Sequence, residues 1–261
     1  MIKAVFFDVD GTLVSHAAGK VPDSAKRAVE ALRAKGIKVF VATGRHRSEL
    51  DETGFLKDMT FDGYIGLNGQ YCWDDHGMLY TLSIDKEDVE TVLTVLEKEP
   101  FSCAFVVDEG LFVNYSDDNT YRAQGDVLTD VPPKGDLNEL AKQPVYQIVA
   151  FTKEKLEEKL GRMLTHCMPN RWNPCGVDFL PMTGGKPNGI MQVIERLGIT
   201  PEECMAFGDG LNDVTMMRAV GISVAMGNAL DAVKAEAAYI TDSVDDDGVV
   251  KALVRFGLIE G

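Results

Sequence analysis

Two carboxylates follow a short apolar run near the start of the chain. Residues 4–7 are apolar, and Asp8-Val9-Asp10-Gly11-Thr12 comes directly after them. Side chains two apart on a strand point the same way, so Asp8 and Asp10 can share a site at the carboxyl end of a strand, where open α/β sheets bind ligands. Like charges held close favour a bound cation, and Mg²⁺ prefers carboxylate and phosphate oxygens. The pair suits phosphoryl transfer, with Asp8 attacking phosphorus and Asp10 protonating the leaving oxygen. Taken alone, an Asp-Gly turn explains Asp10 and Gly11 equally well.

Two further groups supply hydrogen-bond donors and positive charge. Thr43, Gly44 and Arg45 follow the apolar run 39–42, and a hydroxyl and a backbone amide there can donate to a phosphate oxygen. We therefore predict that Thr43, Gly44 and Arg45 bind substrate. The alternative is an ordinary strand-to-helix turn with a threonine cap. Lys186 stands just before an expected helix, where its ammonium group would offset phosphate charge. The alternative is a solvated surface lysine.

A glycine-rich segment carries the last group. Asp209, Asn212 and Asp213 lie within residues 208–213, immediately after the apolar run 205–207. Asp209 is a candidate metal ligand, Asn212 a candidate phosphate donor, and Asp213 would position Lys186 or metal-bound water, although a polar loop with a helix cap is the alternative. Because the four groups supply the different needs of one phosphate and Mg²⁺ site, we interpret them as a single site.

Strand and helix patterns alternate at both ends of the chain. In the N-terminal part the pattern predicts strands at 4–7, 39–42 and 63–67 and a helix at 24–35. In the C-terminal part it predicts helices at 187–197 and 213–219 and strands at 205–207, 222–225 and 239–241. Such alternation indicates right-handed crossovers and a parallel sheet. The predicted fold class is therefore α/β, with a Rossmann-like parallel sheet core.

The middle of the chain follows a different pattern. Strands are expected at 78–84, 104–107, 111–115, 145–151 and 176–180, with helices at 87–97 and 153–166. This order predicts an antiparallel sheet with helices on one face. We expect residues 1–80 and 184–261 to form the core and residues 81–183 to form an inserted α+β domain, long enough to hold its own core.

Composition narrows the classes of partner and compartment. The net charge is −15 and the pI is about 4.7, which argues against a nucleic-acid partner. The five cysteines form no CxxC pair, as expected of free thiols in a reducing compartment. The sequence starts without the pattern of a signal peptide and contains no apolar run of membrane-spanning length. We therefore expect a cytoplasmic protein without membrane association.

The four groups together resemble the haloacid dehalogenase superfamily, and within it the Cof-type sugar-phosphatase branch, over nearly the whole chain. The matching motifs are Asp8-Val9-Asp10-Gly11-Thr12, Thr43-Gly44-Arg45, Lys186, and Gly208-Asp209 with Asn212-Asp213. The resemblance implies that Asp8 is the nucleophile and that Asp10 is the general acid and then the base. It implies Mg²⁺ held by Asp8, the backbone carbonyl of Asp10, and Asp209, with Thr43, Lys186 and Asn212 binding phosphate. It also implies a class IIB cap that closes over the site and selects the substrate, within a monomer, with a dimer as the alternative.

The expected function is hydrolysis of small phosphorylated metabolites, hexose or pentose phosphates first, by a magnesium-dependent phosphatase that forms an aspartyl-phosphate on Asp8. The alternatives are a cofactor-phosphate phosphatase, a sugar phosphomutase, and a non-catalytic module that binds a sugar phosphate. In the inserted domain, Arg122, Trp172 and Asp178 are candidates for contact with a sugar, although surface loops often carry such residues without a ligand.

Overall fold

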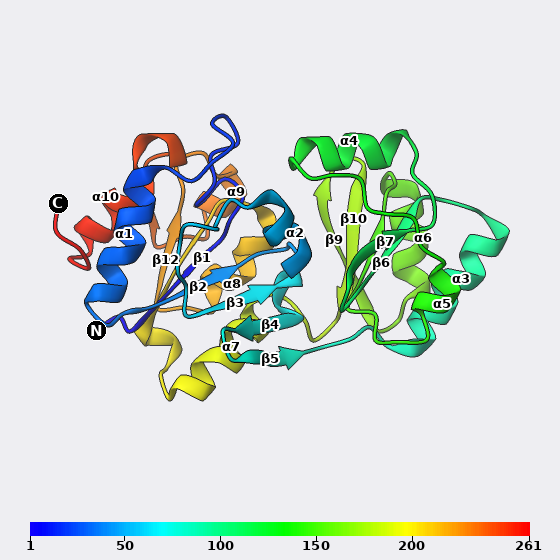
Figure 1. The fold of residues 1–261 in the computed structure, drawn as a ribbon, viewed down its shortest axis with the longest axis horizontal. Coiled ribbons are helices and arrows are strands. Elements are labelled where there is room, and N and C mark those ends of the chain that lie inside the picture. The colour runs from blue at the N-terminus through cyan, green and yellow to red at the C-terminus, as the bar shows by residue number, and fades with distance from the viewer. The chain divides into compact units, whose positions relative to one another are not determined.

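The chain forms two compact units in the computed structural model, which describes residues 1–261 (Figure 1). Unit 1 comprises Met1–Arg45, Gly54–Tyr80 and Gly185–Gly261, and unit 2 comprises His46–Thr53 and Thr81–Gly184. The short segment His46–Thr53, placed in the first part from the sequence, groups with unit 2 because its helix α2 (Arg47–Thr53) contacts strand β7 (Gly110–Val113).

Unit 1 is built on an eight-stranded sheet in the order β13-β12-β11-β1-β2-β3-β4-β5. Its parallel strands are β1 (Ala4–Phe7), β2 (Lys38–Ala42), β3 (Gly63–Gly66), β11 (Cys204–Gly208), β12 (Ile222–Ala225) and β13 (Tyr239–Ile240). The order confirms the predicted α/β fold with a parallel sheet. At one edge, β4 (Tyr71–Asp74) pairs antiparallel with β3, and β5 (Gly77–Thr81) follows it.

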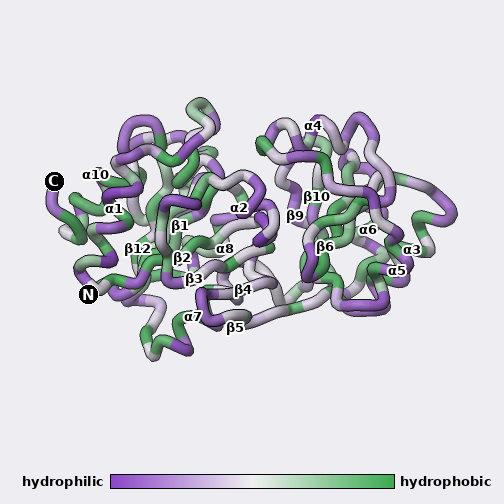
Figure 2. The backbone as a smooth tube through the Cα atoms, viewed as in Figure 1, coloured by the Kyte–Doolittle hydropathy of each residue, from purple (hydrophilic) through white to green (hydrophobic).

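The central strand β1 is buried along its whole length. Its Phe6 ring stacks on Phe40 of β2 with ring centroids 5.2 Å apart, and Phe7 stacks on Phe207 of β11 at 4.8 Å. A strand buried on both faces explains the continuous apolar run in the sequence. Figure 2 shows the same concentration of hydrophobic residues along these strands.

Helices cover the sheet of unit 1. Helix α7 (Lys186–Leu197) packs its residues Ile190, Val193 and Ile194 into the core that contains Phe6 and Phe40. Helix α1 (Asp23–Ala34) contacts β2 and α10 (Gly248–Arg255), while the short helices α8 (Val214–Arg218) and α9 (Asp231–Lys234) follow β11 and β12. The Pro187 at the start of α7 and the left-handed Gly198 after its end are the expected boundary signals.

Unit 2 is an antiparallel sheet in the order β7-β6-β8-β10-β9. Besides β7, its strands are β6 (Cys103–Val107), β8 (Gln147–Ala150), β9 (Cys167–Asn173) and β10 (Gly176–Pro181). The helices are α3 (Lys86–Lys98), α4 (Asp118–Asp126), α5 (Leu137–Leu140) and α6 (Glu154–Met163). Phe105, Ile148 and Phe179 on one sheet face form the core with residues of α3, α5 and α6, so unit 2 has a hydrophobic core of its own.

All five cysteines are free and buried. Burial raises the pKa of the Cys72 thiol to about 12, so this side chain behaves as a small hydrophobic residue. None of the helices combines the length and the hydrophobicity that a membrane-spanning segment requires.

Candidate active site

The predicted site residues meet at the carboxyl edge of the unit 1 sheet. Asp8 follows β1, Thr43 follows β2, and Asp209 follows β11, while Lys186 is the first residue of α7. Parallel strands end at the same edge, so residues far apart in the sequence become neighbours there. Side-chain hydrogen bonds then join these loops to one another.

Lys186 is fully buried between two carboxylates. Its Nζ donates to Asp8 Oδ1 at 2.6 Å and to Asp213 Oδ1 at 2.5 Å. Burial alone would lower the pKa of Lys186, but the charges of Asp213 and Asp8 raise it above its usual value. The ammonium group therefore stays charged and holds Asp8 in a fixed orientation, unlike a solvated surface lysine.

The carboxylates of the site outnumber the positive charge beside them. Burial raises the pKa of Asp8 well above its usual value; Asp213 raises it further, and Lys186 opposes both. Burial, with repulsion from Asp213, also raises the pKa of Asp209 to about 7. Both shifts indicate that this cluster would gain from an additional cation.

Asp213 organises the loop after β11. Its Oδ2 accepts the backbone N–H groups of Asp209 at 2.9 Å and Gly210 at 3.0 Å, while its Oδ1 accepts Lys186. An ideal Cβ on Gly208 would lie 2.5 Å from the Asp213 carboxyl carbon, so this close approach requires glycine. Asp213 therefore joins Lys186 to the backbone of this loop.

A glycine turn brings the loop after β1 against Asp209. Gly11 has a φ of +80°, and an ideal Cβ there would lie 2.2 Å from Asp209 Oδ2. The Thr12 hydroxyl donates to Asp209 Oδ1 at 3.1 Å, and the Asn228 amide donates to the Gly11 carbonyl at 2.8 Å. The turn and its partners fix the distance between the two loops.

Arg45 donates hydrogen bonds to both oxygens of Asp10, the second carboxylate of the first motif. Its Nε donates to Asp10 Oδ2 and its Nη2 to Asp10 Oδ1, both at 2.7 Å, and its guanidinium group lies 5.6 Å from the centre of the Phe55 ring. Such a two-point contact fixes the plane of the carboxylate as well as its charge. Arg45, expected to bind substrate, therefore orients Asp10 in this structure.

The oxygen donors fit a hard divalent cation such as Mg²⁺. Ligand atoms of Asp8, Asp209 and Asp213 all lie within 4.8 Å of one another. Asp213 accepts three hydrogen bonds of 2.5–3.0 Å, and the Asp10 carboxylate is held by Arg45. Asp209 accepts only longer ones, from Thr12 at 3.1 Å and Asn228 at 3.4 Å, and Asp8 accepts from Lys186. This leaves Asp8 and Asp209 as the side chains best placed to bind a cation, and carboxylate oxygens are the ligands that Mg²⁺ prefers.

The remaining predicted residues also lie at this edge. Thr43 is buried, and its Oγ1 accepts the Arg45 backbone N–H at 3.1 Å across Gly44. Asn212 donates from Nδ2 to the side chain of Asn68 at 3.1 Å.

Sequence reasoning missed three residues of this region, namely Thr12, Asn68 and Asn228. Thr12 lies inside the first motif, but its hydroxyl was not singled out. Asn68 follows β3 and Asn228 follows β12, the same position relative to a strand that identified Asp8 and Asp209. A search for every polar residue after a predicted parallel strand would have found both asparagines.

Two of the three sugar-contact candidates lie together in unit 2. The Trp172 indole donates to Asp178 Oδ1 at 2.8 Å. Burial raises the pKa of Asp178 well above its usual value, despite this hydrogen bond, and the charge of Glu49 adds to the effect. Arg122 is exposed on α4 and has no hydrogen bond to either residue.

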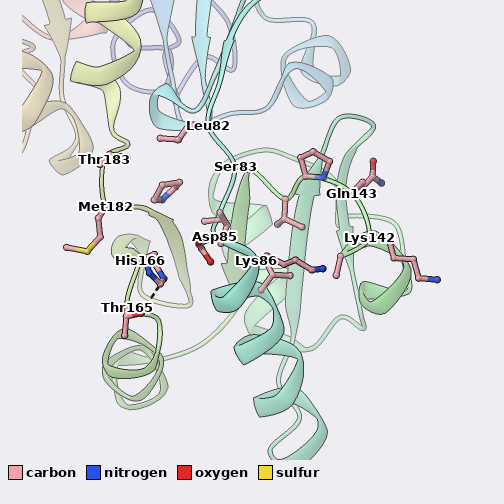
Figure 3. A pocket seen from close by; sticks show the side chains of 16 residues that line it. Leu82, Ser83, Asp85, Lys86, Lys142, Gln143, Thr165, His166, Met182 and Thr183 are labelled. Atoms are coloured by element: carbon pink, nitrogen blue, oxygen red, sulfur yellow. Dashed lines mark hydrogen bonds between the residues drawn. The ribbon is translucent and has the colours of Figure 1, made fainter.

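A separate cavity of about 690 Å³ lies within unit 2 (Figure 3). Its lining includes the start of α3 and the segments around Gln143, His166 and Met182. His166 forms a surface group with Asp85 and Glu87, and its backbone N–H donates to the buried Asp88 at 2.9 Å. None of the residues predicted to act in catalysis lines this cavity.

Comparison with known proteins gives matches over the whole length of the chain. The profile of the haloacid dehalogenase-like hydrolases matches residues 5–253. A Bacillus subtilis (strain 168) protein named as a phosphatase, YkrA, is 31% identical over 259 residues, which cover 99% of both chains. The 5-amino-6-(5-phospho-D-ribitylamino)uracil phosphatase YcsE of the same organism is 30% identical over 261 residues, covering 97% of this chain and 94% of its own.

Solved structures show the same similarity in three dimensions. The HAD subclass IIB sugar phosphatase BT4131 superposes with a TM-score of 0.90 at 37% sequence identity, covering 98% of this chain and 100% of its own. The similarity therefore extends over both units.

Proposed function

We propose a specific reaction for this chain, which belongs to the haloacid dehalogenase-like hydrolases and to their Cof-type branch of phosphatases. The reaction is magnesium-dependent hydrolysis of small phosphate monoesters, hexose or pentose phosphates first, through an aspartyl-phosphate on Asp8. Asp8 is supported as the nucleophile by one observation above all: Lys186 and the chain's own packing hold its buried carboxylate beside a second carboxylate, Asp209, at the sheet edge.

Phosphoryl transfer here divides into two steps. In the first, an oxygen of Asp8 forms a bond to phosphorus while the bond from phosphorus to the sugar oxygen breaks, and Asp10 gives that oxygen a proton. In the second, Asp10 takes a proton from a water molecule whose oxygen attacks phosphorus, which releases phosphate and restores Asp8. Arg45 donates to both oxygens of Asp10 and so orients this carboxylate toward the site.

Charge stabilisation comes from several residues of unit 1. Lys186 offsets negative charge next to Asp8, while the Thr43 hydroxyl, the Gly44 amide and the Asn212 amide are proposed to donate to phosphate oxygens. Mg²⁺, held by Asp8, the Asp10 carbonyl and Asp209, would neutralise phosphate charge and align its oxygens. We propose that unit 2 serves as the cap that selects the substrate.

The names of two relatives support the substrate class. BT4131 is named as a sugar phosphatase, and the name of YcsE specifies a phosphorylated ribityl group. The substrates that these two names specify are phosphate monoesters with several hydroxyl groups. A hexose or pentose phosphate belongs to the same chemical class. A monomer in the cytoplasm remains our prediction for the working form of the protein.

Phosphate release from a panel of sugar phosphates, with Mg²⁺ and with EDTA, tests the proposal. Asp8→Asn should retain the fold and lose activity on the order of a thousandfold or more, because an amide oxygen is a poor nucleophile. The exposed Asp75→Asn change is the matched control and should leave activity unchanged. Native turnover by Asp8→Asn would exclude the covalent mechanism, and conversion between sugar phosphate isomers without free phosphate would select a mutase.

A further inference from the structure

Three consecutive residues after β3 have left-handed backbone conformations. Leu67, Asn68 and Gly69 have φ values of 48°, 52° and 99°. Left-handed geometry is sterically unfavourable for a residue with a side chain, and bulky residues such as leucine rarely adopt it. Such strain persists only where the surrounding structure imposes it, and it clusters at functional sites. Here it lies at the edge of the sheet that carries Asp8.

The backbone of this turn supports the loop after β2. The Leu67 N–H donates to the Arg45 carbonyl at 3.1 Å, and the Asn68 N–H donates to the Thr43 carbonyl at 2.9 Å. On its other side, Gly69 packs so closely against the residue before Lys186 that an ideal Cβ would lie 2.2 Å from the Gly185 carbonyl oxygen. The turn therefore fits between the segments that carry Arg45 and Lys186.

The Asn68 side chain extends this support to the loop after β11. It is buried, and its Oδ1 accepts the Asn212 Nδ2 group at 3.1 Å. On the other side of that amide, Asn212 Oδ1 lies close to Gly210, where an ideal Cβ would be 2.6 Å away. An amide nitrogen has two N–H donors. With one donated to Asn68, the second N–H of Asn212 is held in a defined direction.

We propose that Asn68 is a positioning residue for the phosphate-binding groups: its side chain fixes the Asn212 amide, while its strained backbone holds the Thr43–Arg45 loop. The inference rests on the proposed function, because it gives Asn212 and Thr43 a phosphate to bind. The competing explanation is purely conformational, since asparagine is the residue other than glycine that best tolerates left-handed geometry.

Replacement by glycine separates the two explanations. Asn68→Gly keeps the left-handed backbone accessible but removes the side chain. Under the conformational explanation, phosphate binding is unchanged. Under the positioning explanation, the inhibition constant for inorganic phosphate and the KM both rise about three- to tenfold, the effect of one lost hydrogen bond, while kcat changes less.

A double-mutant cycle shows whether Asn68 acts through Asn212. Asn212→Ala should raise the phosphate inhibition constant, and adding Asn68→Gly to it should produce little further change. Asp247→Gly is the matched control, because Asp247 is also left-handed with a φ of 59° and its side chain accepts a hydrogen bond from Ser24, which is not a residue of the site. This control should leave phosphate binding at the wild-type level, whatever it does to the unfolding midpoint.

Calorimetric titration of the full chain with inorganic phosphate and Mg²⁺ keeps the inference separate from the proposed reaction. If the wild-type protein binds phosphate but hydrolyses no monoester, the proposed function fails and the Asn68 inference is still measured through binding. Unchanged phosphate affinity in a folded Asn68→Gly variant would overturn the inference. Fully additive losses in the double variant, or no phosphate binding by the wild-type protein, would also overturn it.

Discussion

The raised pKa of Asp209 predicts an unusual dependence of stability on pH in the magnesium-free protein. Burial and repulsion from Asp213 raise this pKa from 3.8 to about 7. The folded chain therefore binds a proton more tightly at Asp209 than the unfolded chain does. By linkage, the contribution of this group to the free energy of unfolding is fully present below about pH 4. The contribution is lost as the pH rises through 7. Asp209→Asn carries no titratable group and removes the effect.

The size of the effect follows from the shift. A change of pKa from 3.8 to about 7 corresponds to roughly 4 kcal/mol. Partial solvent exposure of Asp209 and relaxation of the loop reduce this figure, so we expect about 2–4 kcal/mol. We therefore compare the free energy of unfolding of Asp209→Asn with that of the wild-type protein in the presence of EDTA. The difference should shift by this amount in favour of the variant between pH 4 and pH 8.

Urea unfolding of both proteins at pH 4, 6 and 8 measures the difference, from which the titration of groups outside this carboxylate cluster cancels. Asp75→Asn, an exposed change, controls for the general loss of one negative charge. Adding Mg²⁺ at pH 8 should raise the midpoint of the wild-type protein and leave that of Asp209→Asn nearly unchanged. A wild-type-to-variant difference that stays constant across this pH range would refute the electrostatic reasoning.

Three other substitutions test separate contacts of the site. Lys186→Met should cost about 3–5 kcal/mol in urea unfolding, because it leaves buried carboxylates without their cation; a loss below 1 kcal/mol would argue against a buried ion pair. Gly11→Ala should abolish the stabilisation by Mg²⁺ in thermal unfolding, whereas Gly19→Ala, with φ +61° and open space around it, should cost only about 1 kcal/mol of backbone strain and keep that response. Arg45→Lys should lower kcat about tenfold with a smaller change in KM, because lysine cannot hold both oxygens of Asp10; an equal rise in KM alone would assign Arg45 to substrate binding instead.

The parallel core was readable from the sequence because its strands are continuous apolar runs. Residues 4–7 and 39–42 are buried on both faces, and each run is followed by a polar residue of the site. The expected helix at 187–197 matches α7 because proline and glycine mark its ends. In such segments, local chemistry and tertiary environment favour the same structure.

The misses have a physical reason as well. Strand β9 (Cys167–Asn173) was not expected because its residues Asn170, Arg171 and Asn173 are polar, and it is held by pairing with β10 rather than by an apolar pattern. Strand β5 (Gly77–Thr81) was predicted at 78–84, and its neighbour β4 (Tyr71–Asp74) was not predicted. Local pattern does not report the pairing of an edge strand, which depends on its neighbour.

The side-chain contacts within the site could not be predicted from the sequence for a different reason. The contact of Arg45 with Asp10, and that of Asn68 with Asn212, join loops separated by 35 and 144 residues. From residue type alone, Arg45 was predicted to bind substrate, and Asn68 was assigned no role. Only the order of the strands in the sheet shows which of these side chains become neighbours.

The place of β1 has a consequence for how the protein is made. Ala4–Phe7 is synthesised about 200 residues before one of its two neighbouring strands, β11, which begins at Cys204. At roughly 5–20 residues per second, this apolar segment waits on the order of 10–40 seconds for its partner. Unit 2, whose main segment is complete at Gly184 and has its own core, can fold during that interval. Nascent chains should therefore need protection of strand β1 until β11 has been synthesised.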